Sequence, residues 1–278
     1  MEEDKTLNKD NYHSVEMRKK YMGFSQFEDF EKCPVMAMAK INGELDETPT
    51  EAMLFGSWVD AHFSGEEEEF IEKNRSLLYS AKTGKIYAAF NNVQKVIDFI
   101  ENYTNSDGEK PLLKYWQGQT QVIMTGEIMG VPVKIKMDSY FPGKVIVDGK
   151  VMKSFEKDWA EINGRNVKVD FVTARDYSME GAIYQEIEHQ NTKQGKIPFV
   201  LNVVTKEDVP NAELILIDQD ILDERLEYFK EKAPYYQRIK MGLEPAVGCG
   251  KCAACIAKKQ ISRPKSYRKL FLEEKEEY

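Results

Sequence analysis

Three polar side chains in the stretch Lys134–Lys153 have the types and spacing that could hold a divalent cation. Asp138 precedes a Phe-Pro-Gly break at residues 141–143, and Asp148 and Lys150 follow it. Because successive side chains of a β-strand point to opposite faces, Asp148 and Lys150 leave the same face. Carboxylates are the oxygen ligands that Mg²⁺ prefers, and a lysine beside them can orient a water molecule or stabilise a phosphate. The stretch therefore predicts the metal centre of a hydrolase that cleaves phosphodiester bonds.

Two further groups near this stretch could contribute oxygen atoms. The backbone carbonyl of Gly149 lies between Asp148 and Lys150 in the sequence and is a candidate metal ligand. Glu127 precedes the hairpin and could add a carboxylate, although a strand residue that faces solvent would look the same. A surface hairpin with scattered aspartates and lysines is also compatible with the spacing, so the pattern alone leaves that alternative open.

Four cysteines form a second candidate metal site. Cys249, Cys252 and Cys255 have the spacing C-x₂-C-x₂-C, and Cys33 lies more than 200 residues earlier. In a cytosolic chain this spacing favours metal binding over disulfides. It is more typical of an iron–sulfur cluster, here 4Fe–4S, than of zinc, although zinc and four unligated thiols stay open. A metal held by all four would close a very long loop and restrict the unfolded chain.

A basic segment follows the last cysteines. Residues 251–270 contain seven lysines and arginines and no acidic residue. We interpret Lys258, Lys259 and Arg263 as candidate contacts to DNA phosphates, although a solubilising tail would have the same composition. Lys206 follows an apolar stretch and is a fourth candidate, or an ordinary surface lysine at the end of a strand.

The composition limits the class of protein. The 278 residues carry a net charge of −8, which argues against a protein that coats nucleic acid nonspecifically. Charged residues make up 31% and hydrophobic residues 42%, and no apolar run is long enough for a membrane span. The polar N-terminus does not look like a signal peptide, so we expect a cytoplasmic protein.

The pattern of apolar residues predicts an α/β fold in which a central mixed sheet is flanked by helices, with an N-terminal helical layer. The capping pattern of Ser25 and Glu28 predicts the start of the first helix, and Ser178 is expected to cap another. Gly56 is expected to allow close packing. Helices are predicted at 25–41, 52–65, 86–104, 178–190 and 219–241, and strands at 112–116, 119–129, 134–141, 144–153, 167–173, 198–205 and 212–217.

The arrangement of Asp138, Asp148 and Lys150 resembles that of the PD-(D/E)XK nuclease superfamily, most closely its RecB/RecE branch. That branch adds Gly-x-x-x-His on an upstream helix, which Gly56 and Asp60 match with aspartate in place of histidine. It also adds Gln-x-x-x-Tyr on a downstream helix, which we match to Gln185 and His189, with Tyr184 beside them. The matching segments are YMGFSQFEDFEKCPVMAMAKING, LFGSWVDAHFSG, VIVDGK, GAIYQEIEHQ and LNVVTKEDVP, within about residues 25–260.

The resemblance implies a restriction-endonuclease-like fold and a phage exonuclease related to RecE (exodeoxyribonuclease VIII-like). Asp60, Asp138 and Asp148 would bind Mg²⁺ or Mn²⁺, and Lys150, Tyr184 and Gln185 would serve catalysis. AddB-type nucleases show the same layout of one early and three late cysteines around a 4Fe–4S clasp. The implied partners are linear duplex ends or single strands of DNA and a single-strand annealing protein, in a phage-infected bacterium, and homo-oligomers occur in this group.

On this interpretation residues 1–24 are a flexible lead-in, 25–260 are one nuclease domain closed by the cysteines, and 261–278 are a basic and then acidic tail. Two alternatives of another class stay open. One is a DNA-end-binding or recombination-scaffold protein whose nuclease centre has decayed, which the aspartate at position 60 favours. The other is an interaction module closed by zinc.

Overall fold

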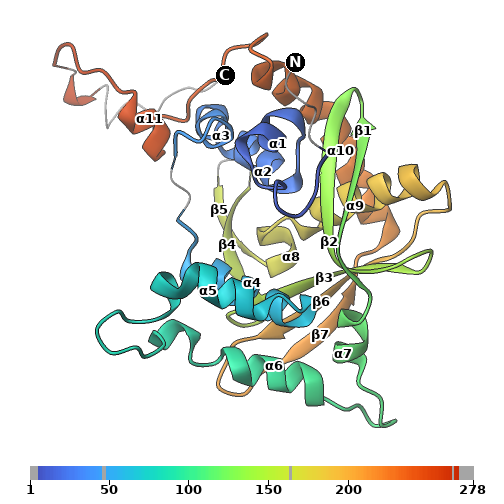
Figure 1. Cartoon of the computed structure of the whole chain (residues 1–278). Coiled ribbons are helices and arrows are strands. Elements are labelled where there is room, and N and C mark those ends of the chain that lie inside the picture. The colour runs from blue at the N-terminus through green and yellow to red at the C-terminus, as the bar shows by residue number, and fades with distance from the viewer. Residues whose placement is uncertain (1–5, 46–47, 163–164, 265, 269–278) are drawn as a thin grey trace.

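A five-stranded mixed sheet lies at the centre of the computed structural model, which describes residues 6–45, 48–162, 165–264 and 266–268 (Figure 1). Its strand order is β1-β2-β3-β6-β7, and only β3 and β6 pair in parallel. This confirms the predicted α/β fold with a mixed central sheet. The strands are β1 Gln119–Ile128, β2 Val131–Phe141, β3 Val145–Met152, β6 Phe199–Thr205 and β7 Ala212–Leu216.

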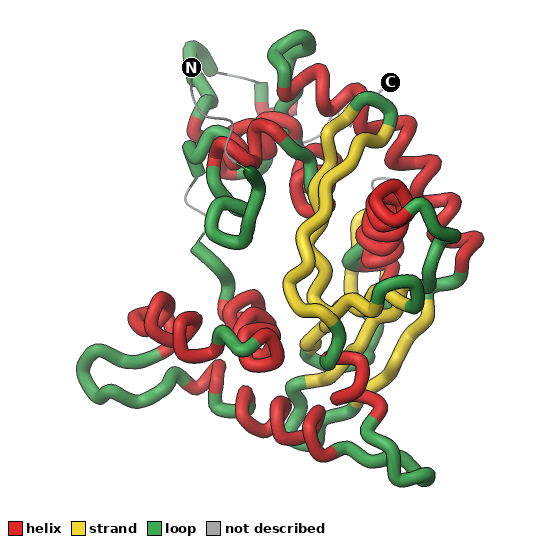
Figure 2. The backbone as a smooth tube through the Cα atoms, turned by 45° about the vertical axis from the view of Figure 1, so that its right-hand side comes forward, coloured by secondary structure: helices red, strands yellow, loops and turns green. Residues whose placement is uncertain are grey.

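Helices cover both faces of this sheet, as Figure 2 shows from a second side. They are α1 Val15–Lys20, α2 Phe24–Lys32, α3 Pro34–Ile41, α4 Glu51–Ser64, α5 Glu67–Leu78, α6 Val93–Asn102, α7 Pro111–Trp116, α8 Phe171–Ala174, α9 Tyr177–Thr192, α10 Gln219–Lys240 and α11 Ala253–Ala257, with a 3₁₀ turn η1 at Ala88–Phe90. Within the described residues, no helix is both long and apolar enough to cross a membrane.

Two hydrophobic clusters hold the helices on the sheet. The larger cluster joins α2, α3, α9 and α10 to the strands and includes Phe27, Phe199 and Phe229, all buried. The smaller joins α4, α6 and α7 and includes Trp58 and Trp116. β3 and β6 therefore lie between two apolar layers, which explains why the stretch 198–205 is almost entirely apolar.

The strands β2 and β3 separate at the position that matters for function. They pair only at Phe141–Val145, Tyr140–Ile146 and Ser139–Val147. Beyond that point β2 continues beside β1, while β3 pairs with β6 as far as Met152–Thr205. The next pair in the ladder would have been Asp138 and Asp148, so these two residues flank the point where the strands part.

Several predicted boundaries were wrong for local reasons. Residues 112–116 form helix α7 and not a strand, because Pro111 suits the first turn of a helix and Leu112 and Trp116 pack into the smaller cluster. Of the predicted helix 86–104, only Val93–Asn102 is α-helical, after the turn η1.

The predicted helix caps also differ. Helix α2 begins at Phe24 with Gly23 as its N-cap, so Ser25 lies inside its first turn and does not cap it. Helix α9 begins after Asp176, and Ser178 lies within it. The predicted strand 167–173 ends at Val169, because the Asp170 carboxylate accepts a hydrogen bond from Thr173 N (2.9 Å) and starts α8.

A small second sheet was not fully predicted. Strands β4 (Asp158–Ile162) and β5 (Arg165–Val169) pair with each other and not with the central sheet. The residues of β5 were predicted to be a strand, but β4 was missed. We attribute this to its composition, since DWAEI contains two acidic residues and one exposed tryptophan, Trp159.

The segment predicted as a flexible lead-in differs from that expectation over its described part. Residues 15–20 form α1, and Met17 and Met22 are buried. Met22 also forms a β-bridge with Val133 of β2, with hydrogen bonds to Pro132 and Lys134 of 2.8 and 3.0 Å. Residues 1–5, Lys265 and the acidic end of the predicted tail, 269–278, lie outside the described residues.

Two glycines give a matched test of the packing. A Cβ on Gly181 of α9 would lie 2.4–2.8 Å from the Phe199 ring of β6, whereas a Cβ on Gly56 of α4 would meet nothing within 4 Å, so the close packing expected at Gly56 is absent. We expect Gly181→Ala to lower the free energy of unfolding by about 1–3 kcal/mol through overpacking. Gly56→Ala is expected to raise it by up to about 1 kcal/mol, as helix propensity dictates. Urea denaturation of both variants measures this, and equal effects would contradict the packing described.

Candidate active site and four-cysteine site

The separation of β2 and β3 brings the predicted metal ligands together. Asp138 Oδ2 accepts a hydrogen bond from Gly149 N (3.0 Å), which replaces the ladder bond lost where the strands part. The carboxylate of Asp148 is 3% exposed. Gly149 itself is required by packing, because a Cβ there would lie 2.0 Å from the Trp116 ring. Its N–H thus has a defined partner, and the role of its carbonyl stays a prediction.

Lys150 lies between two carboxylates. Its Nζ is 2.5 Å from Asp148 Oδ2 and 2.9 Å from Glu180 Oε2, and it lies 4.6 Å from the centre of the Tyr177 ring. Glu180 comes from α9 and was not predicted as a site residue. Glu180 is distinguished by its burial in the first turn of α9. Burial is not visible in the sequence, so sequence reasoning had no signal for it.

Asp60 of α4 lies close enough to Asp138 and Asp148 for their charges to interact. Gln121 Nε2 donates to both of its carboxylate oxygens, at 3.1 and 2.8 Å. Gln121 lies between Thr120 and Val122 of β1, where the β1–β2 register skips it, and has a φ of 54°, which is strained for a residue with a side chain. This backbone conformation and the pairing with Asp60 identify Gln121 as a second residue that sequence reasoning missed.

The carboxylates disfavour one another's charge. Burial, followed by the charge of Asp60, raises the pKa of Asp138 to about 7, against the opposing effect of Lys150. Burial also raises the pKa of Asp60 to about 6, with Lys136 opposing and Asp148 adding to the shift. Burial and Glu180 raise the pKa of Asp148 well above its usual value.

Burial disfavours the charge of Lys150, but Asp148, Glu180 and Asp138 outweigh it and hold its pKa well above the usual range. The lysine in the cluster is therefore a cation, and its role must be that of a donor.

The donor chemistry of these residues suits a divalent cation, although among the described residues only the four cysteines have ligand atoms within 4.8 Å of one another. Asp148 Oδ2 is buried and lies 2.5 Å from Lys150 Nζ, without the geometry of a hydrogen bond. Buried carboxylates that repel one another are the donor set that Mg²⁺ or Mn²⁺ would relieve. Asp60, Asp138 and Asp148 would hold the ion.

Other predicted site residues lie elsewhere. Gln185 is buried and donates to the carbonyl of Ile197 (2.8 Å) and to Gln219 (2.9 Å), so it does not contact Lys150. Tyr184 lines the same cavity as Asp138 and Lys150. Glu180 and Tyr184 have the same spacing in the sequence as the family's Gln-x-x-x-Tyr, with glutamate in place of glutamine, and both line this cavity, whereas Gln185 and His189 do not.

The candidate DNA contacts are scattered over the surface. Lys206 lies over the Phe55 ring at 5.1 Å and borders a different cavity from that of Lys150. Lys258 lies 3.9 Å from Glu44, and Lys259 and Arg263 are exposed near the C-terminus. Their role in DNA binding stays a prediction. Glu127 contacts Gln190 through its backbone, outside the carboxylate cluster.

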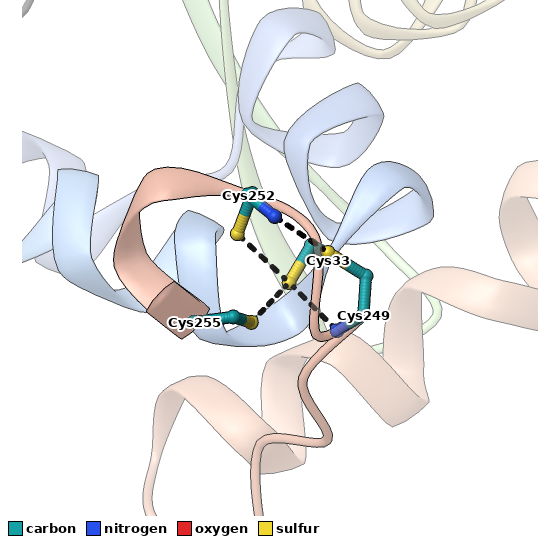
Figure 3. Close-up of side chains that lie close together, drawn as sticks. All are labelled: Cys33, Cys249, Cys252 and Cys255. Atoms are coloured by element: carbon teal, nitrogen blue, oxygen red, sulfur yellow. Dashed lines mark hydrogen bonds between the residues drawn. The ribbon is translucent and has the colours of Figure 1, made fainter. Parts of the chain in front are cut away.

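The four cysteines converge as predicted, and Figure 3 shows them around one point. All four Sγ atoms lie within 4.8 Å of one another. Cys33 Sγ is 3.6 Å from Cys255 Sγ and 3.7 Å from Cys252 Sγ, and it accepts a hydrogen bond from Cys249 N (3.3 Å). Cys33 is buried where α2 ends and α3 begins, so the site ties this corner to the loop before α11.

The sulfur spacing bears on what this site could hold. Four sulfurs at about 2.3 Å from one tetrahedral ion would be roughly 3.8 Å apart. In a 4Fe–4S cluster each thiolate binds a different iron, so the sulfurs would have to lie farther apart. The donor set fits either group, and the spacing in the structure is closer to that of a single ion.

Comparison with known proteins places these features in context. The family model of a PDDEXK-like domain of unknown function (DUF3799) matches residues 23–258. The crystal structure of a protein from Eubacterium rectale, provisionally named an exonuclease, is 35% identical in sequence. It superposes with a TM-score of 0.87 over 96% of this chain and 99% of that one. A search of curated proteins finds no match. The matched range includes the carboxylate cluster and all four cysteines.

The raised pKa of Asp138 predicts how metal and pH act on stability. An ordinary aspartate loses its proton near pH 4, whereas Asp138 keeps it to about pH 7, so the stability of metal-free protein should fall as the pH rises through this window. Asp138→Asn should therefore stabilise the metal-free protein by about 1–3 kcal/mol at pH 8 and by little at pH 4.

Thermal unfolding in EDTA and in MnCl₂ measures this. Manganese should stabilise the wild type more than the variant. Asp107→Asn, in the exposed turn after α6, is the control. A variant that is less stable than the wild type at pH 8 in EDTA would contradict the electrostatic description.

If the four cysteines form one metal site, replacing any one of them should release the metal. Because the four thiolates would act as one unit, Cys33→Ser and Cys252→Ser should each remove bound metal and lower stability by several kcal/mol, on the order of 2–5 kcal/mol. Metal analysis and thermal unfolding of anaerobically purified protein measure both. Full metal content in either variant would show that the thiolates do not form one site.

Proposed function

The chain belongs to the family of PDDEXK-like domains, and on this premise we propose that it is a metal-dependent exonuclease that hydrolyses phosphodiester bonds at DNA ends. The observation that carries the proposal is the position of Lys150, held by Asp148 and Glu180 beside Asp138 where two strands part. The related protein named as an exonuclease supports the same activity.

Mg²⁺ or Mn²⁺, when bound, would stabilise charge on the phosphate and lower the pKa of a bound water. Asp60, Asp138 and Asp148 would hold that ion, and Gln121 would fix the orientation of Asp60. Lys150 is a cation, so it would donate a hydrogen bond to the attacking water or to the phosphate and would not remove a proton. Glu180 would position Lys150, whose Nζ donates to its Oε2, and it also lines the cavity beside Asp148.

Sequence motifs and sulfur distances bear on the biological role of the enzyme and on the metal of the four-cysteine site. The motif resemblance supports a phage RecE-like enzyme that resects DNA for recombination beside a single-strand annealing protein in the bacterial cytoplasm. The cysteine spacing supports an AddB-like 4Fe–4S clasp, whereas the sulfur separations support a single zinc ion. A brown protein that contains iron and absorbs near ~400 nm would favour the cluster, and a colourless protein that contains zinc would favour the single ion.

The test of the active site compares two variants. Lys150→Met should keep DNA binding but lower the rate of cleavage by about 10²–10⁴-fold, since it removes the donor. Thermal unfolding checks its fold, because Asp148 and Glu180 lose their cation. Glu180→Gln should cause a smaller loss in turnover, because glutamine can still accept from Lys150. Digestion of end-labelled linear DNA with Mg²⁺ or Mn²⁺ measures this, and circular DNA tests for the need of an end.

Gln185→Leu is the control. It should lower stability, through the lost hydrogen bond to Ile197 O, with less effect on turnover at a temperature where it is folded. Undiminished cleavage by Lys150→Met would remove the catalytic assignment. Wild-type protein that binds DNA ends but does not cleave them in Mn²⁺ would favour the alternative of a decayed nuclease that acts as a scaffold.

A further inference from the structure

The cavity that contains the carboxylate cluster extends toward a group of cations. It encloses about 310 Å³, and Asp138, Asp148, Lys150 and Glu180 line one part of it. The other part is lined by the N-terminal segment, by the start of α2 and by β2. The cations on its lining are Arg18, Lys40, Lys134 and Lys136.

The strand β2 aligns two of these cations with a catalytic carboxylate. Lys134, Lys136 and Asp138 alternate along β2, so their side chains share one face at intervals of about 6.8 Å. All three line the cavity. A strand of nucleic acid whose scissile phosphate lay at Asp138 could therefore place its neighbouring phosphate at Lys136 or Lys134.

Two of these cations form no ion pair. Lys40 pairs with Asp29, which also lines the cavity, at 2.7 Å, whereas among the described residues neither Lys134 nor Lys136 forms an ion pair. The charge of Lys136 nevertheless lowers the pKa of Asp60. Lys134 is only 6% exposed, and its Nζ donates to the carbonyl of Tyr12. Burial and the charge of Arg18 lower the pKa of Lys134 to about 8. An anion in the cavity would offset this repulsion.

A partly buried lysine lies near this part of the cavity, outside its lining. Lys240 of α10 donates to Tyr21 O (2.8 Å) and to Gln26 Oε1 (2.9 Å). Burial and the charge of Lys134 lower its pKa to about 7. A negative group near Lys134 would therefore also favour the charge of Lys240.

The start of α2 faces the same space. Gly23, Phe24, Ser25 and Gln26 line the cavity, and this first turn has neither a side-chain cap nor an acidic residue. Its backbone N–H groups have no acceptors within the helix, and the helix dipole adds positive potential. The start of α2 therefore adds positive potential to the anion site formed by the cations of the cavity.

The N-terminal segment limits what can enter. The Tyr12 ring lies 4.2 Å from Lys134 Nζ and 5.7 Å from Lys136 Nζ, and Tyr12 and His13 line the cavity beside Arg18. These three residues precede the range 23–258 that matches the family. The segment is tied to β2 through Lys134 and Met22, so it forms a wall of the cavity that a strand entering past the carboxylates would meet.

We propose that this part of the cavity binds the terminal phosphate of a nucleic-acid strand, with Lys134, Lys136 and Arg18 as its partners, while the adjacent phosphodiester lies at Asp138 and Asp148. The inference rests on the proposed nuclease function and names its substrate as a strand with a phosphorylated end. A phosphomonoester carries about −1.5 to −2 charges at neutral pH, so it matches this group of cations better than an internal diester.

The test uses the full chain and linear duplexes that carry a phosphate or a hydroxyl at the 5′ end, and a second pair that differs at the 3′ end. The wild type should degrade strands from one phosphorylated end at least about tenfold faster than from the corresponding hydroxyl end. Which pair shows the preference identifies the end that the cavity accepts.

The variants are Lys134→Met and Lys136→Met, which keep the side-chain length and remove the charge. Each should lower the ratio of the cleavage rates of the phosphorylated and hydroxyl ends toward one. Lys95→Met, on the exposed face of α6, should leave the preference unchanged. Because Lys134 also donates to the Tyr12 carbonyl, thermal unfolding checks whether Lys134→Met is folded. Lys136 has no such hydrogen bond among the described residues, so Lys136→Met tests the charge independently.

The outcomes separate the two proposals. If the wild type cleaves DNA with no preference for a phosphorylated end, the terminal-phosphate site is overturned and the proposed nuclease function stands. An equal change in Lys95→Met would also overturn it, since the effect would then be one of overall charge. If no cleavage occurs, the nuclease proposal fails. Fluorescence anisotropy of the same phosphorylated and hydroxyl duplexes then decides whether the cavity still selects the phosphate.

Discussion

The fold is constrained by the need to bury several carboxylates around one lysine. Asp148 and Glu180 both contact the ammonium of Lys150, while Asp138 and Asp60 lie close enough to raise each other's pKa. Such a group is costly in a protein interior unless a cation is present. A globular protein gains no stability from this arrangement, so its retention is most simply explained by a ligand that completes it.

The surrounding fold holds this costly group in place. The ladder between β2 and β3 ends just before Asp138 and Asp148, and β3 then gains new hydrogen bonds from β6. The ring of Trp116 packs on the bare backbone of Gly149, and α4 and α9 bring Asp60 and Glu180 from opposite sides of the sequence. The site thus lies where the two hydrophobic clusters meet.

The four-cysteine site acts on a different scale. It connects the junction of α2 and α3 with α11 and the loop before it, so that two segments far apart in the sequence lie side by side (Figure 1). Helix α2 is therefore fixed at its C-terminal end by Cys33, while its N-terminal turn lines the cavity. A structural metal there would hold the wall of the active site as well as α11.

The sequence by itself determined the elements whose signals are local. Alternating apolar residues predicted the hairpin that bears Asp138, Asp148 and Lys150, and cysteine spacing predicted the convergence of Cys33 with the late cysteines. The buried strands β6 and β7 and helix α10 were also predicted close to their observed bounds. These patterns depend on the 2.0 and 3.6 residue periods, which tertiary contacts do not change.

Only the tertiary structure decided which side chains complete the site. Glu180 and Gln121 are ordinary polar residues in sequence, and Gln185 looked equally suited to the site until the rotation of α9 directed it to Ile197. Residues 112–116 were β-like by composition, yet packing of Trp116 made them helical. Helix rotation and the separation of strands depend on contacts between segments far apart in the chain, and local sequence does not encode them.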